Sequence, residues 1–158
     1  MRAVLFLCLG LTALAARGQS PEALLSMYHE VAVKSQTDFS GFSVERGREF
    51  YRTVRHGPNG EHACASCHGI DPTRAVEGHS GDIRAECPAC HLSRPGATGR
   101  RPAIRREIRP LAPAADPVRF TDPDHTELWF DVNCFYVLGR GCTALEKGDV
   151  LAYLLSLK

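Results

Sequence analysis

Cys64-Ala65-Ser66-Cys67-His68 is the most informative segment of this chain, and its spacing recurs at Cys87-Pro88-Ala89-Cys90-His91. Both segments have the form CxxCH. Two thiols three positions apart lie on one turn of chain and can add to the two vinyl groups of one haem, and the next residue brings an imidazole to the iron. The first motif therefore predicts haem c attached to Cys64 and Cys67, with His68 as an iron ligand.

The second motif predicts a second haem c on Cys87 and Cys90, with His91 as its ligand. Two alternatives stay open. The four cysteines also fit the two-pair spacing of a zinc ribbon, although such a site leaves both histidines unused. The second pair alone also resembles a thioredoxin-type dithiol or a simple disulfide.

The N-terminus predicts export. Arg2 precedes an apolar run from Ala3 to Ala16 with small residues at its end, a pattern typical of a secretory signal peptide over residues 1–18. An uncleaved anchor is the alternative, but the run is short for a membrane span. Cleavage near Gly18 removes Cys8, and the other cysteines then reach an oxidising periplasm.

Composition indicates one globular domain over residues 19–158. The chain has 158 residues, of which 44% are hydrophobic and 23% charged. Nineteen basic and eighteen acidic side chains leave a net charge of +1. No global field therefore attracts nucleic acid, and a charged partner must meet a local patch.

Helix-start patterns predict an all-α domain. Ser20 with Pro21, Ser43 before residues 44–54, Asp122 with Pro123, and the Thr143 and Glu146 capping box each open a helix. Gly47 lies in the middle of the second helix, which indicates close packing against another element. Val150, Leu151, Leu154 and Leu157 predict the buried stripe of the last helix.

Residues 57–115 are rich in glycine, proline, histidine and arginine and have no sustained apolar period, so they cannot build a core unaided and something else must organise them. The sixth iron ligand is restricted as well. The only methionines are Met1 and Met27, which leaves a histidine, an amide or no ligand. His79 is the prediction for the second haem, followed by His56, His62 and His125.

Several segments resemble the sphaeroides haem protein family of class I c-type cytochromes. They are Ser43 to Tyr51, Cys64 to Pro72, the Pro110–Pro117 run, Arg119-Phe120-Thr121-Asp122, Asn133-Cys134, Gly139-Arg140, Cys142-Thr143 and Glu146 to Val150. The resemblance implies a class I cytochrome c fold, here with an extra N-terminal helix and an inserted loop at about 75–100 that carries the second motif. The resemblance does not extend over the inserted loop and therefore implies nothing about its role.

The resemblance also implies site residues. Asn133 matches a distal asparagine that yields to oxygen, carbon monoxide or nitric oxide, and Cys134 and Cys142 match a disulfide. The residues alone make Asn133 a turn residue before an irregular loop. Trp129 and Phe130 are expected to line the haem pocket, with ordinary core as the alternative for such an aromatic pair. Val132 and Gly141 stand where charged residues are usual in the family, so the polarity of the distal pocket differs.

These observations together predict a periplasmic di-haem cytochrome with redox-linked gas binding and electron transfer. Its expected partners are a redox cytochrome or a membrane electron donor, and a small gas. The basic run Arg94, Arg100, Arg101, Arg105, Arg106 and Arg109 would contact haem propionates or an acidic partner, or form a solvated face. The alternative is a plain electron carrier. Reduction of oxygen or nitric oxide has no acid–base constellation to support it.

Overall fold

The computed structural model describes residues 20–76 and 107–158. The predicted signal peptide, the second motif with Cys87, Cys90 and His91, and His79 lie outside the described residues. Within the two described ranges, no helix is both long enough and apolar enough to cross a membrane.

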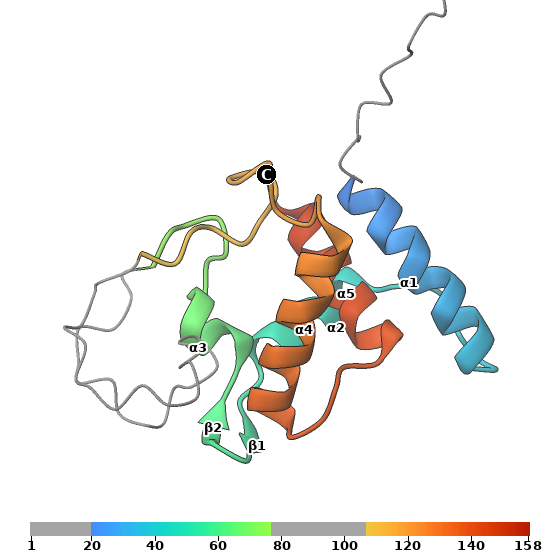
Figure 1. The fold of residues 1–158 in the computed structure, drawn as a ribbon, viewed down its shortest axis with the longest axis horizontal. Coiled ribbons are helices and arrows are strands. Elements are labelled where there is room, and N and C mark those ends of the chain that lie inside the picture. The colour runs from blue at the N-terminus through green and yellow to red at the C-terminus, as the bar shows by residue number, and fades with distance from the viewer. Residues whose placement is uncertain (1–19, 77–106) are drawn as a thin grey trace, which may run out of the picture.

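The described residues form an all-α fold with one short hairpin (Figure 1). The elements in chain order are α1 Pro21–Ser35, α2 Val44–Arg52, β1 Arg55–Gly57, β2 Gly60–His62, α3 Cys64–His68, α4 Pro123–Leu138 and α5 Ala144–Ser156.

The predicted helix starts are confirmed, because each first turn receives a local cap. The side chains of Ser20, Ser43, Asp122 and Thr143 each accept a hydrogen bond from a backbone N–H three residues later. Glu146 completes the capping box of α5. The second helix ends at Arg52, slightly earlier than expected.

Gly47 marks the place where α2 crosses α5. A methyl group on its Cα would lie 1.9 Å from the carbonyl oxygen of Asp149 and 2.9 Å from Cβ of Tyr153. Tyr51, one turn further along α2, is fully buried, and its ring centroid lies 5.7 Å from that of Tyr153. The close approach predicted at Gly47 is therefore confirmed.

The core is centred on α5. One cluster joins α2 to α5 through Tyr51, Val150, Tyr153 and Leu154, and a second joins α1 to α5 through Leu24, Tyr28 and Leu151. Phe120 and Phe130 pack against both clusters, so the core interpretation of Phe130 is confirmed. Leu157 lies just past the end of α5, half-buried against the first cluster.

The β1–β2 hairpin was not expected. Its strands pair antiparallel up to Gly57 opposite Gly60, with a two-residue turn between them. Strands of three residues are too short to show an alternating pattern, and the run Gly57-Pro58-Asn59-Gly60 was the available turn signal. The hairpin packs on the end of α4, because a methyl group on Gly57 would lie 2.5 Å from the carbonyl oxygen of Val137.

An isolated antiparallel bridge joins Val76 to Ile108, with N–H···O distances of 2.9 and 2.8 Å. These two residues flank the segment that the structure does not describe. Gly69, directly after α3, also lies against Val76, since a methyl group on it would come within 2.8 Å of Cγ2. The inserted segment therefore leaves and rejoins the described fold close to the end of α3.

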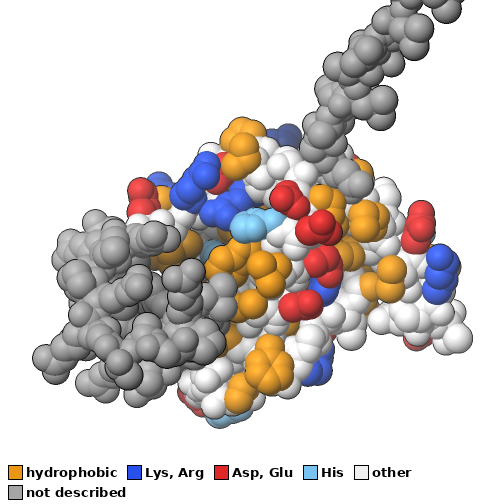
Figure 2. Space-filling model, in the orientation of Figure 1, with side chains coloured by type: hydrophobic (Ala, Val, Ile, Leu, Met, Phe, Trp, Pro, Cys, Tyr) orange, Lys and Arg blue, Asp and Glu red, His pale blue; other side chains and the backbone are white. Residues whose placement is uncertain are grey.

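The face that includes α4 carries a hydrophobic patch beside a row of acidic side chains. Figure 2 shows hydrophobic side chains gathered there, with acidic side chains along one edge. Leu128 and Phe135 of α4 are 52% and 60% exposed. A net charge near zero thus coexists with a local patch, as a charged partner would require.

Candidate haem site

The first CxxCH motif forms the one-turn helix α3. Ser66 accepts a hydrogen bond at its side chain from the N–H of Ala63, at 3.0 Å, and so caps this turn. Gly69 ends it at φ 77°, a conformation that favours glycine. The helix carries both cysteines at i, i+3 spacing, which puts them on one face.

Tyr51 fixes the end of this helix from α2. Its hydroxyl donates a 2.7 Å hydrogen bond to the carbonyl oxygen of Gly69. Burial raises the pKa of the Tyr51 hydroxyl well above its ordinary value, so it remains a donor over the usual pH range. The contact places the motif against the α2–α5 core.

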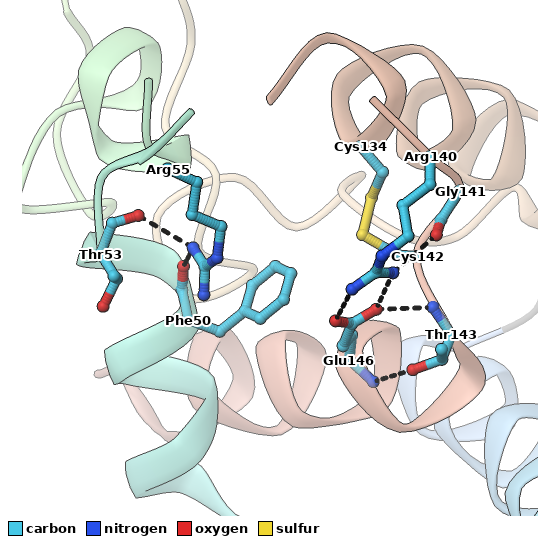
Figure 3. Close-up of polar contacts among 9 residues, drawn as sticks. All are labelled: Phe50, Thr53, Arg55, Cys134, Arg140, Gly141, Cys142, Thr143 and Glu146. Atoms are coloured by element: carbon cyan, nitrogen blue, oxygen red, sulfur yellow. Dashed lines mark hydrogen bonds and ion pairs between the residues drawn. A yellow bond between two sulfur atoms is a disulfide. The ribbon is translucent and has the colours of Figure 1, made fainter. Parts of the chain in front are cut away.

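Cys64 is a free thiol packed against the apolar cluster of α2 and α5. Burial raises its pKa to about 11, although the charge of Arg55 acts in the opposite direction. The guanidinium carbon of Arg55 lies 4.1 Å from the centroid of the Phe50 ring, and the guanidinium donates hydrogen bonds to the carbonyl oxygens of Phe50 and Thr53 (Figure 3). The Cys64 thiol is therefore protonated at neutral pH and lies in apolar surroundings, which suit a haem edge.

His68 is half-buried and neutral. Burial, followed by the charge of Arg119, lowers its pKa to about 4. Its Nδ1 atom is fully buried and has no hydrogen-bond partner among the described residues, so burial of the ring is not offset by a bond at this atom. Neutral imidazole is the form that ligates metals. The residues present thus fit a haem bound by Cys64, Cys67 and His68.

Asn133 lies inside α4, so its interpretation as a turn residue before a loop is wrong. It shares a helix face with Thr126 and Val137, and both are buried. Asn133 itself is half-buried. Its carboxamide makes no hydrogen bond to any other residue of 20–76 or 107–158.

Cys134 and Cys142 form a disulfide between α4 and the loop before α5 (Figure 3). Within this loop Arg140 donates two hydrogen bonds to Glu146, at 2.8 and 2.6 Å. The Thr143 N–H donates a third at 2.8 Å. Burial raises the pKa of Glu146, but these bonds outweigh it and lower the pKa overall. The loop is therefore closed both covalently and by an ion pair.

The other candidate ligands in the described ranges lie elsewhere. His56 is exposed and pairs with Glu61 at 3.2 Å, and the His62 ring lies 4.9 Å from that of Tyr136. His125 accepts a 3.1 Å hydrogen bond from the indole of Trp129, and Met27 is 46% exposed on α1. Within residues 20–76 and 107–158, none of these contacts involves a residue of α3.

An all-α fold that presents CxxCH on a capped turn, with a neutral, half-buried histidine, defines a c-type cytochrome with covalently bound haem c. The chain belongs to the family of Cytochrome c-type protein SHP. It is 35% identical to that protein from Cereibacter sphaeroides over 136 residues, which cover 85% of this chain and 82% of the relative. Residues 37–82 and 75–154 also match the family described as a domain of unknown function (DUF1924).

Two solved structures support the assignment. The structure of oxidized SHP, described as an oxygen binding cytochrome c, matches with a TM-score of 0.64 and 33% identity, covering 88% of this chain and 98% of that one. The solution structure of cytochrome c'' from Methylophilus methylotrophus matches with a TM-score of 0.65 and 29% identity, covering 87% and 93%. The predicted all-α cytochrome c fold is confirmed.

Two residues near the site were missed by the sequence analysis, Asp116 and Arg119. Asp116 is buried, and the charge of Arg119 acts on His68. The available signal was the Arg119-Phe120-Thr121-Asp122 segment, which was used for family resemblance alone.

Proposed function

We propose that this protein is an exported cytochrome that binds a diatomic gas, such as oxygen, nitric oxide or carbon monoxide, in a redox-linked way. In this proposal Cys64 and Cys67 hold the haem, His68 is the proximal ligand and Asn133 is a displaceable distal ligand. The haem supplies an iron that changes oxidation state and accepts a sixth ligand.

The placement of Asn133 carries the proposal. Asn133 is half-buried on the helix face that carries Thr126 and Val137, and its carboxamide makes no hydrogen bond to another described residue, so it is available to a ligand site. An amide is neutral and ligates weakly, so its displacement costs little. The two relatives point the same way, since SHP is described as oxygen binding and the cytochrome c'' structure addresses haem-ligand detachment.

The surroundings of Asn133 restrict how its side chain could leave the iron when a gas binds. Cys134, the next residue, is bonded to Cys142, and Gly57 of the hairpin packs on the backbone of Val137 one turn later. Both contacts hold the C-terminal half of α4 in place. Release of the ligand then needs only a rotation of the Asn133 side chain, which leaves the fold unchanged.

The second motif extends the proposal to electron supply. Cys87, Cys90 and His91 would hold a second haem with His79 as sixth ligand, and a cytochrome or membrane donor would reduce it. Support comes from the base of the insertion, where Val76 pairs with Ile108 and contacts Gly69 at the end of α3. A haem carried by this segment would be tethered close to the first one.

Replacement of Asn133 tests the gas site. In Asn133→His a stronger ligand must be displaced, so we expect carbon monoxide affinity of the reduced protein to fall by at least about tenfold. Asn133→Ala removes the ligand, and affinity should be kept or rise. Affinity is measured by absorbance titration of the dithionite-reduced protein.

Asn59→Ala, in the turn of the hairpin, is the matched control and should leave the titration unchanged. Equal carbon monoxide affinities for the wild type, Asn133→His and Asn133→Ala would show that Asn133 is not the distal ligand.

A further inference from the structure

The loop over residues 109–120 encloses a buried carboxylate between two arginines. Asp116 is 3% exposed, its Oδ1 accepts a 2.7 Å hydrogen bond from Arg109, and its Oδ2 lies 3.2 Å from Nε of Arg119. Oδ2 is fully buried and makes no hydrogen bond within the described part of the chain. Burying a carboxylate is costly unless it is paired, so the two arginines offset that cost. The cluster as a whole keeps one positive charge.

Arg119 is held in one place by several contacts. Its Nε also donates to the carbonyl oxygen of Pro110 at 2.8 Å, and Nη2 donates to that of Arg109 at 3.0 Å. Its side chain is only 28% exposed. A guanidinium fixed to two carbonyl groups and a carboxylate has little freedom to move away from its neighbours.

The loop packs directly on the haem motif. The N–H groups of Leu111 and Ala112 both donate to the carbonyl oxygen of Pro72, at 2.8 and 2.9 Å, four residues after His68. Phe120 packs against the same cluster as Cys64. Phe120 also adopts φ 61°, a left-handed conformation that is unfavourable for a non-glycine residue and persists only where the surroundings impose it.

We propose that Arg119 is a positioning residue whose fixed charge raises the reduction potential of the haem held by His68, and that Asp116 limits this effect. The ferric state carries one more positive charge than the ferrous state, so a nearby cation favours reduction. The loop that holds Arg119 packs on Pro72, four residues after His68, which keeps this charge on the side of the haem motif. The inference requires the haem at the first motif and is independent of gas binding.

Charge variants of the holoprotein test this by spectroelectrochemical titration, with haem content checked by pyridine haemochrome. Asp116→Asn should move the midpoint of the first haem to higher potential, and Arg119→Gln should move it to lower potential. Arg119→Lys keeps the charge but loses contacts to the carbonyl groups, so it should lower thermal stability while changing the midpoint less than Arg119→Gln.

Asp149→Asn is the matched control. Asp149 is 4% exposed and accepts bonds of 2.7 and 2.9 Å from Arg46, but it lies at the α2–α5 crossing and not in this loop. This variant should lose stability with little change in midpoint. If Asp116→Asn and Arg119→Gln shift the midpoint in the same direction, or by no more than Asp149→Asn does, the proposal is overturned.

Discussion

At the scale of single residues, Gly47 sets how closely α2 and α5 approach. A methyl group there would meet the backbone of Asp149 at 1.9 Å, and backbone inside a helix cannot move aside cheaply. We expect Gly47→Ala to lower the free energy of unfolding by about 2 kcal/mol or more. Urea denaturation of the holoprotein measures this.

Gly141→Ala is the matched control, because no atom of the described residues lies within 4 Å of a methyl group at that position. It should change the free energy of unfolding by less than about 0.5 kcal/mol. Similar losses in Gly47→Ala and Gly141→Ala would show that the helix crossing is not as tight as described.

Residues whose chemistry depends on local spacing could be predicted from sequence. The haem attachment proposed for the first motif is of this kind, since CxxCH is itself the attachment geometry. Asp116 could not be predicted as a buried group, because its burial depends on how the loop folds against Pro72. The bond from Tyr51 to Gly69 spans 18 residues and leaves no pattern in sequence.

At the scale of elements, Glu146 links the start of α5 to the disulfide loop. Its pKa lies below the ordinary value of 4.5, so the ionised carboxylate stabilises the fold above that pH. This contribution is lost as the pH falls through the lower, folded-state pKa. We expect Glu146→Gln to lower the free energy of unfolding by about 1 kcal/mol at pH 7, because it weakens the helix cap and the two hydrogen bonds from Arg140. Near pH 2 the loss should be close to zero.

Urea denaturation at both pH values measures the difference. Glu45→Gln is the control, because Glu45 also pairs with an arginine, Arg48, but both side chains are exposed. It should have little effect at either pH. A stability loss in Glu146→Gln that stays the same at pH 2 would contradict the role of the ionised carboxylate.

The helices were predictable where a side chain caps its own first turn, as at Ser43 and Thr143. The length of α4 was not. Asn133 and Cys134 suggested a loop, yet α4 continues to Leu138 and ends only at Gly139, which adopts a left-handed conformation. The glycine carried the stop signal, and the position of Asn133 on a helix face follows from that boundary.

At the scale of the whole molecule, a few specific contacts attach the haem motif to the helical core. Among the described residues, the α2–α5 crossing and α1 form the core. The haem motif α3 is attached to this core through Tyr51 and to the 109–120 loop through Pro72. The fold class could be predicted from caps and family resemblance, whereas these attachments required the tertiary structure.

A carbon monoxide titration of the dithionite-reduced mature protein, normalised to total haem by pyridine haemochrome, tests the central claim most directly. We predict two haems per chain, and we expect carbon monoxide to bind to one of them, so that a saturable absorbance change accounts for about half of the total haem. A reduced protein in which no haem responds would be a closed electron carrier, and that result would contradict gas binding at Asn133.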